Sequence, residues 1–162
     1  MKRRAEIRVS SELDAGAEAV WARAIDPAGI NHELRPLMRM TVPKGAENFG
    51  LDDPEPGHIG RSWIFLFGLI PFDYDDLNIV RVEPGRSFLE RSSMLSMRLW
   101  EHERTITPLD ENRCRVEDRL AWEPRLPLPG RCLRPAVHAI FKHRHRRLRR
   151  AWTPPLRFDP CP

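Results

Sequence analysis

The stretch Trp100–Trp122, WEHERTITPLDENRCRVEDRLAW, decides the fold of this chain. Each half alternates between two kinds of position, which is the period of a β-strand with one buried face. The turn-forming residues Asp110-Glu111-Asn112 separate the halves and predict a β-hairpin. A shift of one residue would turn every side chain to the other face, so the pattern also predicts the register. The predicted cross-strand pairs are Trp100–Trp122, His102–Leu120, Arg104–Asp118 and Ile106–Val116.

A long amphipathic helix is predicted after the hairpin, beyond a proline-rich connection at Pro124–Gly130. Apolar residues recur at helical spacing over roughly 20 residues, and polar positions interrupt the apolar stripe near its middle. Residues 153–162 hold four prolines, so we expect an irregular tail there. The stripe consists of Leu133, Val137, Ile140, Phe141, Leu148 and Trp152.

The N-terminal part predicts one strand and two short helices. Ala5–Leu13 alternates as a half-buried strand does. Asp14 offers an N-cap to the first helix, whose apolar residues follow at helical spacing. Asp26 and Pro27 read as a cap and a first-turn proline for a second helix, which ends before Pro36.

The middle of the chain is predicted to alternate between strands and turns. A loop spans Pro43–Gly60, where seven residues are proline or glycine. Loops of this length often act as lids or binding segments. A turn is expected at Pro71–Tyr74. The expected strands are Leu37–Val42, Arg61–Ile70, Leu77–Val82 and Arg86–Ser93.

Length and composition favour one globular domain, which we place at residues 1–152 of the 162. Apolar residues make up 41% and charged residues 31%, as is usual for globular proteins. No apolar run approaches the ~18 residues that span a bilayer, and no secretory signal is visible. We therefore expect a cytoplasmic location.

The order of these elements resembles the helix-grip superfamily, often labelled SRPBCC, which includes START lipid-transfer domains, Bet v 1-like proteins and polyketide cyclases. The chain looks like a mostly uncharacterised bacterial branch of it. The resemblance implies an α+β fold: a curved antiparallel sheet wraps around a long C-terminal helix, with two short helices after the first strand. It also implies a cavity between sheet and helix. The segments that carry it are Asp14–Trp21, Trp100–Arg104, Val116–Leu120 and Phe141–His145.

Charged residues are predicted on the concave face of the hairpin. Arg104 lies opposite Asp118 and beside His102, and the parity of the preceding strand lets Glu90 join them. In one interpretation Arg104 and Asp118 neutralise each other and hold the register, because buried charges need partners. In the other, His102 and Glu90 bind a polar ligand group, and His102 is the candidate catalytic acid or base.

Aromatic residues cluster on the predicted strands and are expected to form core, ligand wall or both. The complete set of candidate ligand-binding residues is Trp63, Phe65, Glu90, Trp100, His102, Arg104, Asp118, Trp122 and Phe141.

A basic segment gives the chain its net charge of +4. Three interpretations stay open: a solvated outer helix face, a surface for anionic lipid headgroups formed by Arg146, Arg147, Arg149 and Arg150, or a nucleic-acid surface. The last is disfavoured, since no aromatic interleaving accompanies the charges. The segment's basic residues are Lys142, Arg144, Arg146, Arg147, Arg149 and Arg150.

Neither a metal nor another cofactor is expected. His143 and His145 are two residues apart and point away from each other on a helix, and no Cys or carboxylate cluster joins them. Gly57-His58-Ile59-Gly60 does not match a phosphate-binding loop.

Three functional hypotheses follow. The first is a carrier or sensor of a small hydrophobic molecule or lipid, with Pro43–Gly60 and the C-terminal helix framing the opening. The second is a polyketide cyclase or aromatase-like enzyme in which His102 acts as acid–base and Arg104 or Glu90 orients the substrate. The third is an interaction protein that uses the basic helix face.

Overall fold

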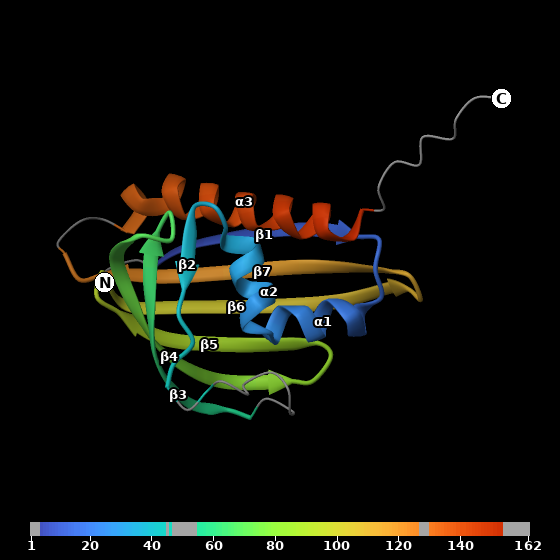
Figure 1. The fold of residues 1–162 in the computed structure, drawn as a ribbon, viewed down its shortest axis with the longest axis horizontal. Helices are drawn as coiled ribbons and strands as arrows, with labels where there is room; N and C mark the ends of the chain where they lie inside the picture. Colours follow the sequence, from blue (N-terminus) through green and yellow to red (C-terminus); the bar gives the residue numbers. More distant parts are fainter. Residues whose placement is uncertain (1–3, 45, 47–54, 127–129, 154–162) are drawn as a thin grey trace.

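A computed structural model of the chain describes residues 4–44, 46, 55–126 and 130–153. These residues form one antiparallel sheet in the order β1-β7-β6-β5-β4-β3-β2. The fold is α+β, and the predicted helix-grip arrangement is confirmed (Figure 1). The strands are β1 (Ala5–Leu13), β2 (Met38–Met40), β3 (Gly57–Leu66), β4 (Ile70–Glu83), β5 (Ser87–Met94), β6 (Met97–Asp110) and β7 (Arg113–Pro124).

Three helices accompany the curved sheet: α1 (Ala17–Ile25), α2 (Pro27–Leu34) and α3 (Arg134–Trp152). A short 3₁₀ turn, η1 (Gly130–Leu133), precedes α3. Figure 1 shows α3 running along the β1 side of the sheet, while α1 and α2 lie in front of its strands. No helix within the described ranges is long and apolar enough to span a membrane.

The hairpin of β6 and β7 has the predicted register. Trp100 pairs with Trp122, His102 with Leu120, Arg104 with Asp118, and Ile106 with Val116. The pairs lie in the middle of the sheet, since β1 covers the far edge of β7 and β5 covers that of β6. This position explains why Arg104 and Asp118 are almost fully buried, at 1% and 0% exposure.

The strand boundaries before β5 differ from the prediction. The turn lies at Phe67-Gly68-Leu69 and not at Pro71–Tyr74, because Gly68 takes a positive φ of 73° and Phe67 one of 52°. As a result β4 begins at Ile70 and is much longer than expected. The predicted loop Pro43–Gly60 ends earlier, since β3 starts at Gly57, and residues 45 and 47–54 lie outside the described part. The tail predicted at 153–162 also lies outside it, apart from Thr153.

Two short helices hold one side of the fold. Gly16 caps α1, and the predicted cap Asp14 is wrong. Asp26 caps α2 as predicted: its carboxylate accepts a hydrogen bond from the Gly29 amide at 3.1 Å, with Pro27 in the first turn. A Cβ at Gly29 would lie 2.0 Å from the carbonyl oxygen of Arg23, so only glycine lets α2 pack this closely on α1.

The apolar core consists of two clusters, one at each end of the sheet–helix interface. Trp21 of α1 packs in the first cluster with Ile106 and Val116. Phe141 of α3 packs in the second with Leu120 and Trp122. Polar residues and a cavity occupy the space near these clusters.

Candidate functional site

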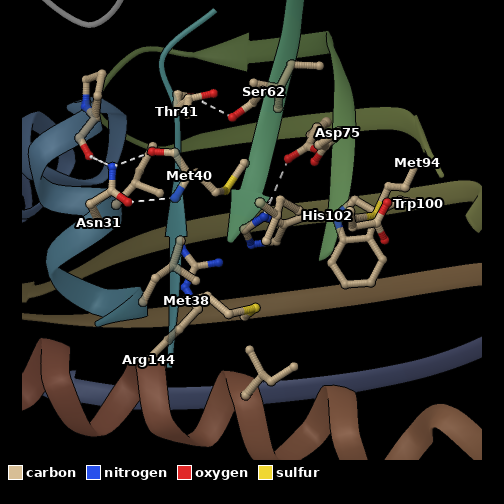
Figure 2. A pocket seen from close by; sticks show the side chains of 18 of the residues that line it. Asn31, Met38, Met40, Thr41, Ser62, Asp75, Met94, Trp100, His102 and Arg144 are labelled. Atoms are coloured by element: carbon tan, nitrogen blue, oxygen red, sulfur yellow. Dashed lines mark hydrogen bonds and ion pairs between the residues drawn. The ribbon is translucent and has the colours of Figure 1, made fainter. Parts of the chain in front are cut away.

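A cavity of about 360 Å³ lies between the sheet and the helices. Figure 2 shows its wall, to which α2, β2, several sheet strands and α3 contribute. Asn31 holds α2 to β2, because its side chain donates to the Met40 carbonyl oxygen at 2.9 Å and accepts from the Met40 amide at 2.8 Å. Most of the wall is apolar, and examples from different elements are Ile30, Leu34, Met38, Ile64, Leu77, Ile79, Met94, Val137 and Ile140.

Three of the titratable residues that line the sheet side of the cavity lie close together: Asp75 of β4, Glu90 of β5 and His102 of β6. They are 3%, 7% and 5% exposed. His102 Nδ1 lies 3.8 Å from Glu90 Oε2, and the carboxyl of Asp75 is hydrogen-bonded to that of Glu90. Because two bonded carboxyls need a proton between them, this trio can accept, donate or share protons with a bound molecule.

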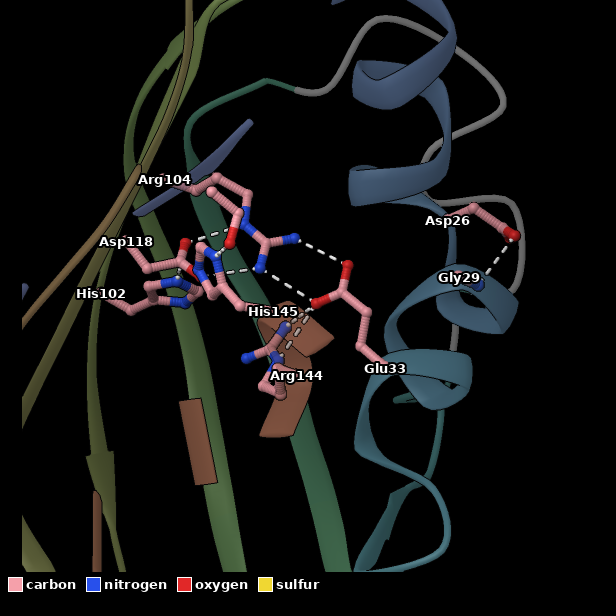
Figure 3. Close-up of polar contacts among 9 residues, drawn as sticks. Asp26, Gly29, Glu33, His102, Arg104, Asp118, Arg144 and His145 are labelled. Atoms are coloured by element: carbon pink, nitrogen blue, oxygen red, sulfur yellow. Dashed lines mark hydrogen bonds and ion pairs between the residues drawn. The ribbon is translucent and has the colours of Figure 1, made fainter. Parts of the chain in front are cut away.

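Arg104 joins the sheet to α2 (Figure 3). Its guanidinium donates to both carboxylate oxygens of Asp118, at 2.8 and 2.7 Å. It also donates to both oxygens of Glu33, at 2.8 and 2.9 Å. Two bidentate contacts of this kind fix the positions of three elements relative to one another.

Two basic residues of α3 complete this ion cluster. Arg144 donates to Glu33 Oε2 from Nε and Nη2, at 3.2 and 3.0 Å. His145 Nε2 lies 3.0 Å from Asp118 Oδ2, and its Nδ1 lies 2.9 Å from the hydroxyl of Ser11. With His102 Nε2 at 2.9 Å from Oδ1, the carboxylate of Asp118 accepts four hydrogen bonds, which is its full capacity.

The surroundings of Asp118 and Glu33 favour their charged forms. Burial alone would raise both pKa values, but Arg104 outweighs it. The pKa of Asp118 is held well below its ordinary value by Arg104 and His102, and that of Glu33 is lowered by Arg104 and Arg144. Both residues are therefore carboxylates at neutral pH.

The trio that faces the cavity divides its protons unequally. Burial and the neighbouring Glu90 raise the pKa of Asp75 well above its ordinary value. Although burial opposes it, His102 lowers the pKa of Glu90, and Asp118 with Glu90 raises the pKa of His102. These shifts favour a charged Glu90 and a charged His102 beside a protonated Asp75.

The predicted site residues separate into three groups. Glu90, Trp100, His102 and Phe141 line the cavity. Arg104, Asp118 and Trp122 are buried but do not line it. Trp63 and Phe65 do not line it either, and the expectation that they face inward is wrong. Ser62 and Ile64 point inward instead, while Trp63 is 45% exposed and packs against Tyr74 at a ring distance of 5.7 Å.

Four residues of the site were missed in the sequence: Glu33, Asp75, Arg144 and His145. Arg144 and His145 are the polar positions that interrupt the apolar stripe of α3, which was a usable signal. Glu33 lies four residues after the buried Gly29, on the inner face of α2. Asp75 was missed because the predicted strand begins only at Leu77, whereas β4 begins at Ile70.

The basic segment does not form a single outer face. Arg144 is 8% exposed and belongs to the ion cluster, so its predicted place among solvated residues is wrong. Arg146, Arg149 and Arg150 are exposed, and Arg147 donates to the carbonyl oxygen of His32 at 3.1 Å. Within the described ranges no group of three or more His, Cys, Asp or Glu side chains could hold a metal ion.

Solved structures with the same architecture come from several bacteria. A START superfamily protein from Mycobacterium smegmatis matches with a TM-score of 0.69 at 12% identity, over 93% of this chain and 97% of its own. Protein CV1439 from Chromobacterium violaceum matches with a TM-score of 0.69 at 16% identity, over 92% and 98%. The Zhui aromatase/cyclase from Streptomyces sp. R1128 matches with a TM-score of 0.64 at 12% identity, over 92% and 93%.

At these identities the likenesses show the fold alone, and they confirm the predicted helix-grip resemblance at that level. The fold is typical of hydrophobic-ligand-binding proteins and of cyclases. No curated protein sequence matches the chain. The family described as Domain of unknown function (DUF8410) matches residues 11–152, which is most of the chain, and the chain therefore belongs to this family.

Proposed function

We propose that the chain binds a small, mostly apolar molecule in the cavity between the sheet and the helices. The observation that carries this proposal is a mostly apolar cavity of about 360 Å³ with Asp75, Glu90 and His102 on its sheet side. Cavities of this kind are typical ligand sites, because apolar walls supply affinity and a few fixed polar groups supply orientation. Asp75, Glu90 and His102 orient the polar end of the ligand.

The replacement Ile64→Trp is expected to weaken binding, because the larger ring occupies part of the cavity from β3. The measurement is a fluorescence titration with N-phenyl-1-naphthylamine, a neutral probe of apolar cavities. The wild-type protein should enhance and saturate the fluorescence, and Ile64→Trp should weaken binding by roughly tenfold or more, the equivalent of ~1.4 kcal/mol.

Phe65→Trp is the matched control, since it enlarges the next residue of the same strand, which does not line the cavity. It should bind the probe as the wild type does. Equal binding by all three proteins would place the probe elsewhere and contradict the proposal. Native mass spectrometry of the freshly purified protein, followed by solvent extraction, then identifies any retained molecule.

A second candidate function is an acid–base reaction on the bound molecule, of the cyclase or aromatase kind. It is favoured by the meeting of Asp75, Glu90 and His102 in one cavity, since such a reaction needs more than one titratable group near the substrate. A synthetic poly-β-ketone thioester tests it: mass spectrometry should detect loss of water with the wild type and not with His102→Gln. A thioester that binds and stays unchanged would leave only the binding function.

A further inference from the structure

Asp75 has a carboxyl oxygen that no protein group satisfies. Its Oδ1 is buried and without a hydrogen-bond partner, although buried polar atoms normally have one. Two other buried side-chain atoms of the described residues share this condition, on Arg23 and Trp152, but neither of those residues lines the cavity. Figure 2 shows Asp75 directed from β4 toward the cavity. The missing partner of Oδ1 would therefore be a hydrogen-bond donor on a bound ligand.

Buried acids outnumber buried bases around the cavity and the ion cluster. Among the described residues on this side of the sheet there are five acids and four bases, even if both histidines are counted as charged. Every acid except Asp75 has a basic partner or accepts hydrogen bonds at both carboxyl oxygens. Asp75 is hydrogen-bonded to Glu90 and Ser92, but its Oδ1 has no partner. The acids are Glu33, Asp73, Asp75, Glu90 and Asp118, and the bases are His102, Arg104, Arg144 and His145.

The partners of the four other acids are already in place. Glu33 and Asp118 bind Arg104. Glu90 is paired with His102 and accepts from the Ser92 hydroxyl at 2.8 Å. Asp73 accepts from the Tyr74 amide at 2.8 Å and from both the amide and the hydroxyl of Ser96. Asp75 is thus the one acid of this set that lacks a counter-charge and has a free acceptor atom.

We propose that the ligand is an apolar molecule bearing a protonated amine, and that the carboxylate of Asp75 binds its ammonium group. An ammonium supplies the donor that Oδ1 lacks, and its positive charge balances the carboxylate that forms when Asp75 loses its proton. A neutral hydroxyl would supply only the donor, and a carboxylate ligand would add a sixth acid. This inference rests on the proposed binding function and specifies the ligand's polar end.

Binding of a cation requires Asp75 to give up its proton to solvent, because its raised pKa favours the neutral acid. The groups that face it are Asp73, Glu90, His102 and, from α3, Arg144. Since the pKa of Asp75 is raised, affinity for an amine should increase as the pH is raised. Affinity for an uncharged ligand should not change in this way.

The experiment compares three probes with one apolar body: decylamine, decanol and decanoate, each displacing N-phenyl-1-naphthylamine. With the wild type, decylamine should bind about tenfold to hundredfold more tightly than decanol, as expected for charge-assisted hydrogen bonds. Decanoate should bind most weakly. Asp75→Asn should remove the preference for decylamine over decanol.

Asp76→Asn is the matched control, because it removes the same charge from the neighbouring residue, whose side chain contacts His58 outside the cavity. It should keep the preference. Equal affinities of decylamine and decanol for the wild type would overturn the amine inference while the proposed binding function stands. A preference that survives Asp75→Asn would overturn the role of Asp75. Absence of binding by all probes would overturn both proposals.

The wild type alone also tests the inference if Asp75→Asn does not fold. Its affinity for decylamine should rise relative to that for decanol between about pH 5 and about pH 8, where decylamine itself stays protonated. A ratio that stays constant across this range would contradict the inference.

Discussion

Replacing Arg104 with methionine should lower the free energy of unfolding by about 3–5 kcal/mol, the usual cost of removing one partner from a buried ion pair. Arg104 is 1% exposed and binds two carboxylates, Asp118 and Glu33, that are themselves fully buried. Methionine keeps much of the side-chain volume, so little of the loss comes from packing. The loss arises because two buried carboxylates are left without the guanidinium that neutralises them.

Urea unfolding followed by tryptophan fluorescence measures this effect, and Arg81→Met is the matched control. Arg81 also forms an ion pair, with Glu103, but its side chain is 50% exposed. Exposed pairs contribute at most about 1 kcal/mol, so the control should stay close to the wild type. Similar losses of unfolding free energy in the two variants would mean that Arg104 and its ion cluster contribute no more to stability than an exposed ion pair does.

Stability should be greatest on the acid side of neutrality, at about pH 5, and should fall in both directions from there. The folded-state pKa values of Asp118 and Glu33 are lowered, so their contribution is present above about pH 4 and is lost as the pH falls further. The folded-state pKa values of His102 and Asp75 are raised. Their contribution is present at low pH and is lost as the pH rises through those values.

Unfolding free energies measured in urea from about pH 3 to about pH 9 check this profile. His102→Gln should flatten the decline on the alkaline side, because glutamine does not titrate, and should also reduce the acid-side contribution of Asp118, whose pKa His102 helps to lower. A wild-type profile that rises steadily to pH 8 would contradict the assigned protonation of His102 and Asp75.

Much of the fold follows from the sequence because its strongest local pattern also carries its central tertiary contact. In Trp100–Trp122 the alternation and the turn agree on one register, and that register places Arg104 opposite Asp118. The boundaries of β3 and β4 are harder to predict from the sequence. Gly68 and Pro71 are both turn-forming residues three positions apart, so the place of the turn is ambiguous, and a positive φ at Phe67 is not encoded by residue type.

Only part of the candidate site can be predicted from the sequence, for a related reason. Partners on one hairpin, such as His102 and Asp118, can be matched by counting residues. Glu33 meets Arg104 and Arg144 across the interior, and α2 and α3 are helices whose relative placement no local period encodes. Charged residues on the inner faces of α2 and α3 were signals, but each is readable only once its partner is known.

The ion cluster fixes α3 to the sheet and to α2 at one place along its length, at Arg144 and His145. The cavity-lining residues of this helix all lie N-terminal to that place or at it, from Ala136 to Arg144. The ion cluster therefore anchors the helix near its middle. Fluctuations of α3 should be smallest at His145 and largest at η1. A bound molecule would then exchange with solvent past the N-terminal end of α3, while the ion pairs of Arg144 and His145 stay intact.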